Sequence, residues 1–271
     1  MGSRWLEALM ESRPEEVPER PEKNPVLYYK TRTIRSGSLT EVECYPVYSW
    51  SYRRTLSKTH PTSEAMRAVN NRNARKKFER LAECNFKPGT DYALSLTYAG
   101  KAPESSGQCE KDLRNYMRRV NRARKKLGLG KARCIGVIET GSCGGRLHHH
   151  LLIEGGLNRD TMEQLWGLGH ANCDRIREGV TALVRYMTKG FDGKRENGRH
   201  RYFYTKNLVR PRVTESRSRI SRRQAERIRE DADMNAEVII RKKWPDRKLE
   251  SVELKQSDWL PGVYIYARMR R

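Results

Sequence analysis

The sequence has none of the features of a membrane-spanning or exported protein. No apolar run among its 271 residues approaches the roughly 18 residues that a membrane-spanning helix requires. The first residues, MGSRWLEALMESRPEEVPER, contain no uninterrupted apolar segment of the kind found in signal peptides. Leu6 stands where a myristoylation motif needs serine or threonine. We therefore expect no membrane partner and a location in the cytoplasm.

The cysteines show no pattern of a structural or metal-binding framework. There are six of them, with no Cys-x-x-Cys pair and no regular spacing. Disulfide-rich domains and zinc ribbons both need such spacing, so both classes are disfavoured. We expect reduced thiols.

Acidic residues are scarce relative to basic ones. The chain has 56 Lys and Arg against 33 Asp and Glu, which gives a net charge of +23. Solubility alone does not account for a surplus of that size, which predicts a polyanionic partner. Nucleic acid is the favoured partner, and a membrane surface or an acidic protein is the alternative.

Strand-like and helix-like patterns interleave along the chain, which predicts an α+β fold with a central antiparallel sheet and flanking helices. The first 25 residues carry four prolines among charges and predict a loosely packed arm. The expected strands cover residues 39–50, 92–98, 132–139, 147–155, 170–176, 201–205, 249–254 and 263–269. The expected helices cover residues 63–84, 108–126, 158–166 and 179–189, and a basic helix begins at Ser221, where SRRQ fits a capping box.

Three segments follow from this pattern. Residues 1–60 are expected to form an N-terminal arm and a strand. Residues 61–210 are expected to form the core domain. Residues 211–271 form a basic C-terminal extension, a helix and strands that pack on that core.

The helix expected at 108–126 has one apolar face and one basic face. Leu113, Met117 and Val120 face inward at helical spacing. No acidic residue interrupts the outer face after Asp112. A solvated surface is the alternative interpretation, but the run favours contacts to phosphates. The candidate DNA-binding residues are Arg114, Arg118, Arg119, Arg122, Lys125 and Lys126.

Three consecutive histidines lie in the aliphatic segment GRLHHHLLIEGG. In a strand, His148 and His150 share one face while His149 points to the other, among leucines and isoleucine. The glycine-rich TGSCGGR predicts a tight antiparallel hairpin with the preceding strand. A Gly144–Gly145 turn would place Glu139 opposite His150, and a Cys143–Gly144 turn would place it opposite His148.

In either register a carboxylate and two imidazoles share one face. This donor set suits Mg²⁺, Mn²⁺ or Zn²⁺, and the ligand types do not choose among them. The alternative is a polar sheet surface without a metal.

The helix expected at 179–189 places a phenol beside an ammonium. Val180, Val184 and Met187 form part of its inner stripe. Tyr186 and Lys189 lie one turn apart on a neighbouring stripe, and Gly190 is a natural end for the helix. A phenol needs nearby positive charge to act as a nucleophile at neutral pH. A half-buried structural tyrosine is the alternative.

The order of these motifs resembles the HUH endonuclease superfamily, and more narrowly the rolling-circle replication initiators related to the filamentous-phage gene II replication protein. The resemblance spans residues 73–190 and rests on five stretches. They are NARKKFERLAECNFKPGTDYALSLTYAG, DLRNYMRRVNRARKKLG, GVIETGSCGGRLHHHLLIEGG, LWGLGHANCDRI and ALVRYMTKG. One departure is His149, since the residue between the two ligand histidines is usually hydrophobic.

The resemblance implies an enzyme with an HUH/RRM-like sheet in its core domain. It implies that Glu139, His148 and His150 bind a divalent metal, Mg²⁺ or Mn²⁺, and that Tyr186 attacks DNA. Lys189 would lie beside the scissile phosphate or its leaving group. The product would be a 5′-phosphotyrosine and a free 3′-hydroxyl, and the DNA would be rejoined later.

The implied partners are single-stranded or hairpin origin DNA, a host polymerase and a host helicase, in the cytoplasm of a bacterial host. The chain lacks a Gly-x-x-x-x-Gly-Lys-Ser/Thr motif, so we do not expect it to unwind DNA itself. The rival functions are an HUH transposase or relaxase and a non-catalytic nucleic-acid-binding protein. The fallback nucleophiles are Tyr98, Tyr202 and Tyr204.

Overall fold

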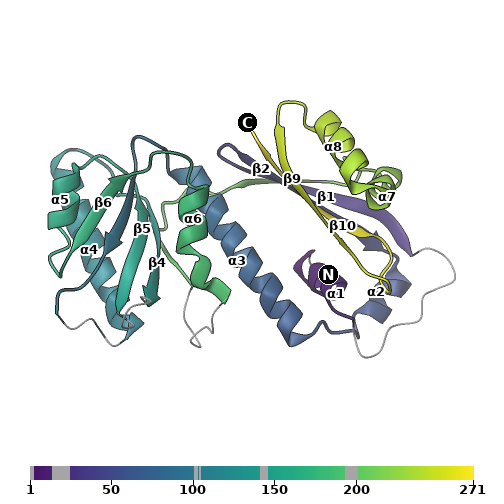
Figure 1. Ribbon diagram of the computed structural model, residues 1–271, viewed down its shortest axis with the longest axis horizontal. Coiled ribbons are helices and arrows are strands. Elements are labelled where there is room, and N and C mark those ends of the chain that lie inside the picture. The colour runs from purple at the N-terminus through teal and green to yellow at the C-terminus, as the bar shows by residue number, and fades with distance from the viewer. Residues whose placement is uncertain (1–2, 14–24, 101–102, 104, 141–145, 193–200) are drawn as a thin grey trace. The chain divides into compact units, whose positions relative to one another are not determined.

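A computed structural model describes residues 3–13, 25–100, 103, 105–140, 146–192 and 201–271. The chain divides into two compact units, one of residues 1–73 and 211–271 (unit 1) and one of residues 74–210 (unit 2). Each contains a five-stranded antiparallel sheet with helices (Figure 1). The predicted α+β fold class is confirmed, and the described residues form two sheets where the sequence predicted one.

The sheet of unit 1 is built from both ends of the chain, in the strand order β8-β1-β2-β10-β9. Strand β2 pairs with β1 on one side and with the C-terminal β10 on the other. The strands are β1 (Val26–Ser36), β2 (Leu39–Tyr48), β8 (Arg212–Ser216), β9 (Lys248–Gln256) and β10 (Val263–Arg270). The helices are α1 (Ser3–Glu11), α2 (Trp50–Leu56), α7 (Arg222–Glu230) and α8 (Ala232–Lys243).

Helix α1 corrects the expectation of a loosely packed N-terminal arm. Leu6 and Leu9 are buried in the core of unit 1. On its polar side, Glu7 lies 2.5 Å from the Lys255 ammonium. The prolines that predicted an arm begin at Pro14, after this helix ends, and residues 14–24 lie outside the described residues.

The basic helix α7 begins where its sequence predicts. The Ser221 hydroxyl accepts a hydrogen bond from the Gln224 amide at 3.2 Å. The Gln224 side-chain oxygen accepts one in return from the Ser221 amide at 3.0 Å. This reciprocal pair is the capping box, and it fixes the first turn.

The sheet of unit 2 has the order β6-β3-β5-β4-β7. Its strands are β3 (Tyr92–Leu96), β4 (Cys134–Thr140), β5 (Leu147–Ile153), β6 (Ala171–Arg175) and β7 (Phe203–Tyr204). Its helices are α4 (Ser106–Lys126), α5 (Arg159–Gln164), α6 (Thr181–Met187) and the 3-10 helix η1 (Lys189–Asp192), joined by the C-terminal part of α3 (Ser63–Asn85). The helices predicted at 63–84 and 108–126 are present to within two residues.

Helices cover both faces of this second sheet. Leu94 and Leu151 pack against α4 and α5 in one core cluster. Ile135, Val137 and Leu152 pack against α3 and α6 in another. The sheet therefore has an α4 face and an α6 face, and alternate residues of a strand belong to different faces.

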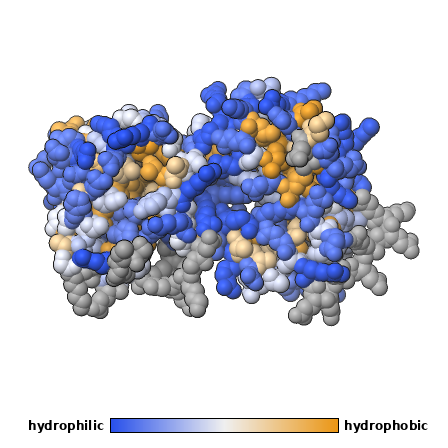
Figure 2. All heavy atoms as spheres, in the orientation of Figure 1, coloured by the Kyte–Doolittle hydropathy of each residue, from blue (hydrophilic) through white to orange (hydrophobic). Residues whose placement is uncertain are grey.

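Hydrophilic side chains cover most of the surface shown in Figure 2, in both units. This agrees with a composition in which 33% of the residues are charged. Among the described residues, no helix combines the length and the apolar character needed to cross a membrane.

Candidate metal centre and nucleophile

Strands β4 and β5 bring a carboxylate and two imidazoles to one place. Their antiparallel register pairs Glu139 with His148 and Val137 with His150. This is one of the two registers expected from the sequence, the one that a Cys143–Gly144 turn would give. The turn itself lies outside the described residues.

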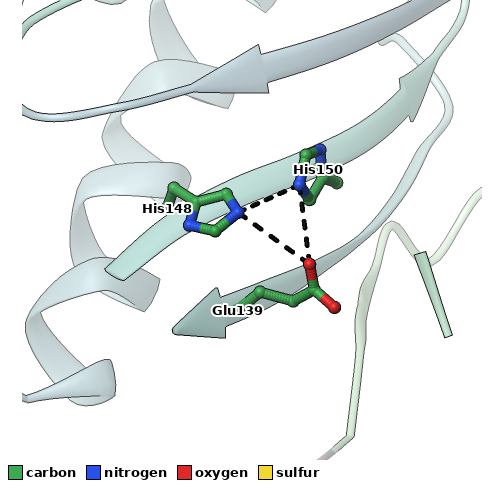
Figure 3. Close-up of side chains that lie close together, drawn as sticks. All are labelled: Glu139, His148 and His150. Atoms are coloured by element: carbon green, nitrogen blue, oxygen red, sulfur yellow. Dashed lines mark hydrogen bonds and ion pairs between the residues drawn. The ribbon is translucent and has the colours of Figure 1, made fainter. Parts of the chain in front are cut away.

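The three side chains converge on the α6 face of the sheet (Figure 3). The Nε2 atoms of His148 and His150 lie 3.0 Å apart. The Oε2 atom of Glu139 lies 3.8 Å from the first and 3.6 Å from the second. All three side chains are half-buried and together form a group that could hold a metal ion.

These separations fit a small divalent cation. A point equidistant from the three atoms lies about 2.0 Å from each, and metal–nitrogen and metal–oxygen bonds of such ions are about 2.0–2.2 Å long. Two imidazoles and one carboxylate are donors that Mg²⁺, Mn²⁺ and Zn²⁺ all accept. The donor set therefore fits a metal without identifying it.

The other ring nitrogens of the two histidines have partners that orient them. The Nδ1 atom of His148 lies 3.3 Å from the Arg146 carbonyl oxygen, to which it can only donate. The Nδ1 atom of His150 lies 3.0 Å from the Ser95 hydroxyl of β3. Such partners leave Nε2 available as a ligand and fix the plane of the ring. Ser95 was not among the site residues predicted from the sequence.

Burial keeps His150 neutral at physiological pH. Loss of solvation, together with the smaller electrostatic effects of His148 and Lys189, lowers the pKa of His150 to about 4. A neutral imidazole is the form that binds a metal, because protonation occupies the ligand lone pair.

His149 points into the core on the α4 face, as its position in the strand predicts. The side chain is completely buried, and its Nε2 atom lies 2.9 Å from the Tyr98 hydroxyl. The Tyr98 hydroxyl also donates to Asp112 of α4 at 3.2 Å. Burial lowers the pKa of His149 to about 4. The third histidine is therefore a packed, neutral residue on the opposite face from Glu139.

Tyr186 and Lys189 lie beside the histidine and carboxylate group. The Tyr186 ring meets the His150 ring edge-on at 5.2 Å, and 52% of the tyrosine is exposed. The Lys189 ammonium lies 4.4 Å from the centre of the Tyr186 ring and 4.0 Å from Oε2 of Glu139. The structure thus brings all five predicted side chains together.

The helix that carries Tyr186 is shorter than predicted. Helix α6 ends at Met187, with Thr188 as its C-cap, instead of continuing to Lys189. The Thr188 hydroxyl donates to the Val184 carbonyl at 2.8 Å, and the chain tightens into η1. Lys189 therefore reaches the Tyr186 ring from a 3-10 turn and not from the same α-helix.

The other candidate tyrosines lie in less suitable places. Burial raises the pKa of the Tyr202 hydroxyl to about 12, and its ring packs edge-on against Phe78. Tyr98 is on the α4 face, where burial also raises its pKa. Tyr204 is half-buried next to the Arg210 guanidinium.

The basic row of α4 lies on the opposite face of the sheet from Glu139. The inner residues Leu113, Met117 and Val120 are buried as predicted. Arg119 donates to the carbonyls of Leu165 at 2.7 Å and Trp166 at 2.6 Å, so its guanidinium contacts the protein. The other predicted DNA-binding residues of the row are exposed; they are Arg114, Arg118, Arg122, Lys125 and Lys126.

Residues 91–191 match the model of the replication-associated protein ORF2/G2P family. No curated protein and no solved structure matches the chain. The matched segment includes Glu139, His148, His150, Tyr186 and Lys189, and it supports a role in the initiation of replication.

Proposed function

We propose that this chain initiates rolling-circle replication as an HUH endonuclease that nicks and later rejoins a single-stranded or hairpin origin. The observation that carries the proposal is the convergence of a Glu-His-His group with Tyr186 and Lys189 inside the family-matched segment. The two alternatives were a polar sheet surface without a metal and a structural tyrosine. Neither alternative explains why these five side chains lie together.

Three residues would hold the metal. Glu139, His148 and His150 would bind Mg²⁺ or Mn²⁺ through the atoms whose separations fit such an ion. Such an ion, when bound, supplies positive charge to the oxygens of a phosphate. Ser95 and the Arg146 carbonyl would hold the two imidazoles in the orientation for binding.

Tyr186 would be the nucleophile. Its oxygen would form a bond to phosphorus, and the bond from phosphorus to the 3′-oxygen would break. The phenolic proton leaves the tyrosine as the 3′-oxygen gains one, so the products are a 5′-phosphotyrosine and a free 3′-hydroxyl. Because the phosphodiester energy is kept in the covalent bond, the 3′-hydroxyl can later attack and restore the DNA.

Lys189 would supply positive charge beside the reacting phenol. Its ammonium lies over the Tyr186 ring and close to Glu139, so it would sit near the scissile phosphate or the leaving oxygen. Positive charge at that place would stabilise the negative charge that develops on the phosphate and the leaving oxygen.

The remaining parts of the proposal concern partners and place. The row that contains Arg118 and Arg122 would bind DNA phosphates. The free 3′-hydroxyl would prime a host polymerase, and a host helicase would separate the strands. We place the reaction in the cytoplasm of a bacterial host and the catalytic domain within residues 61–210.

The test is a search for a covalent protein–DNA adduct. The full chain is incubated with Mn²⁺ and a pool of single-stranded hairpin oligonucleotides, labelled at the 3′ end and randomised in the loop. We expect a labelled adduct on a denaturing gel, because the fragment downstream of the cut stays on the protein. A chelator should abolish it.

Tyr186→Phe is the matched variant, since it removes one oxygen and keeps the ring that packs against His150. We expect no nicking and no adduct, with DNA binding retained. An adduct that peptide mass mapping places on Tyr98, Tyr202 or Tyr204, or cleavage by the Phe variant, would overturn the assignment.

A further inference from the structure

A concave site lies on the α4 face of unit 2, the opposite face of the sheet from Glu139, His148 and His150. It has a volume of about 480 Å³ and is formed by the outer side of α4 together with strand β7. Three cationic side chains line it, Lys111, Arg114 and Arg118, and all three are exposed. Asn115 lines the same site, and Phe203 contributes a half-buried aromatic ring.

The Phe203 ring and the α4 cations together indicate the chemical class of the ligand. Cations alone would suit any polyanion, and an aromatic ring alone would suit any apolar group. A nucleotide has both an anionic phosphate and a flat π face, and nucleic-acid sites without sequence preference combine a basic groove with an aromatic ring on which a base stacks. A volume of about 480 Å³ is of the size that small-molecule sites have.

The neighbouring contacts leave these groups available. Arg114 pairs with Glu110 at 3.5 Å, but both are exposed and such a surface pair contributes little. Arg118 donates to the Asn115 side-chain oxygen. The amide nitrogen of Asn115 adds a hydrogen-bond donor to the lining of the site. Phe203 packs on the core with part of its ring, and the rest lines the site.

The site lies close to the metal group along the sheet but on the other face. Phe203 pairs with Gly136 of β4, which lies three residues before Glu139, or roughly 10 Å along the strand. Among the described residues, strand β7 is the last strand of its sheet on that side. A DNA strand that passes this edge can therefore contact both faces.

We propose that this site, the α4–β7 pocket, binds a nucleotide of the DNA strand outside the nicked phosphodiester, with the base on Phe203 and the phosphate on the α4 cations. The proposal rests on the proposed function for the identity of the strand. The earlier proposal was that the basic row of α4 binds DNA phosphates. The pocket adds a residue that contacts a base, Phe203, at one end of that row.

The test compares Phe203→Leu with Tyr204→Leu in the full chain. Both residues are half-buried aromatics of the same strand, but only Phe203 lines the pocket. Binding of a fluorescent 12-nucleotide single strand is measured in the presence of a chelator, with the same strand lacking its bases as a second probe. Thermal unfolding checks that both variants are folded.

We expect the native chain to prefer the strand with bases, and Phe203→Leu to reduce that affinity roughly 5- to 150-fold, the range for loss of one base stack. The salt dependence should not change, because no charge is removed. Tyr204→Leu should bind like the native chain. In addition, a strand containing 5-iodouracil should crosslink under light to the peptide that carries Phe203.

Equal binding of both probes by the native chain, or an unchanged affinity of folded Phe203→Leu, would overturn the proposal. A crosslink mapped only outside α4 and β7 would do the same. These outcomes are separate from failure of the proposed function, since binding is measured without metal and requires no reaction at Tyr186. Base-dependent binding at Phe203 by a chain that forms no adduct would support the pocket and refute the nicking.

Discussion

Three consecutive histidines have two different environments at the scale of single residues. His148 and His150 point to the α6 face, where Ser95 and a backbone carbonyl orient their rings. His149 points to the α4 face and contacts the rings of Tyr98 and Trp166. The strand alternation made this division predictable from the sequence. The hydroxyl of Ser95 was not, because β3 and β5 pair across more than 50 residues.

This division predicts different outcomes for substitutions at adjacent positions. His148→Ala or His150→Ala removes one of three ligands and should abolish Mn²⁺ binding and DNA cleavage. His149→Phe should retain both, because it keeps an aromatic ring in the core. Calorimetric titration with Mn²⁺ and the adduct assay give the two readouts. The assignment of His148 and His149 to opposite faces of β5 would be wrong if folded His149→Phe failed to cleave DNA while His148→Ala still cleaved it.

His149 also predicts a dependence of stability on pH. Its pKa is about 4 in the folded chain, against an unfolded value near 6.5. The unfolded chain therefore binds the proton more readily, so the stability from this residue is complete above pH 6.5 and falls as the pH drops towards 4. His150 acts in the same direction.

We expect His149→Phe to reduce the loss of unfolding free energy between pH 7 and pH 5 by about 2 kcal/mol. Urea unfolding of the native chain and of His149→Phe at the two pH values, with a chelator present, measures this change in unfolding free energy. The same loss in the native and variant chains would mean that His149 is protonated in the folded state.

At the scale of elements, the β4–β5 hairpin and α6 show what the sequence could determine. Side chains alternate between the two faces of a strand, so Glu139 shares a face with His148 and His150 in either register of the hairpin. The Glu-His-His group was therefore predictable from the sequence, although the register was not. The end of α6 was not predictable from Gly190, because Thr188 is already the C-cap and the chain continues as the 3-10 helix η1. Lys189 still reaches Tyr186, since one 3-10 turn replaces the last α-helical turn.

Helix α4 predicts a separable contribution to DNA binding. Single-strand affinity falls with salt by a slope of about 0.7 per phosphate contact. Arg118→Glu with Arg122→Glu should reduce that slope by roughly 1 to 2. Metal binding should not change, because α4 covers the opposite face from Glu139. Fluorescence titration at several salt concentrations measures the slope.

The matched control reverses two exposed cations outside α4, Lys87 and Arg177. It makes the same change in net charge, so a smaller change of slope would identify contacts at α4 itself. An equal change in both double variants would show that only the overall charge matters and would move the DNA path off this helix.

At the scale of the whole molecule, local sequence patterns could not predict which distant strands pair. β2 pairs with β10 and β1 pairs with β8, in each case across more than 150 residues of chain. The predicted C-terminal strands are present, but their partners belong to the N-terminal segment. Both units contribute to the basic character, with 28 Lys and Arg against 14 Asp and Glu in residues 74–210 alone.

The two units have separate hydrophobic cores, which leads to a prediction about unfolding. Leu56 of α2 and Leu113 of α4 are both helical and completely buried, one in the core of unit 1 and the other in that of unit 2. Replacement of either by alanine should cost about 2–5 kcal/mol in its own unit.

Mn²⁺ should stabilise unit 2 alone, because a ligand stabilises the fold that binds it. Scanning calorimetry with and without Mn²⁺ should therefore resolve two transitions. Leu113→Ala should lower the transition that Mn²⁺ raises, and Leu56→Ala should lower the other. A single transition that both substitutions and Mn²⁺ shift together would show that the units unfold as one and that the metal group depends on the whole chain.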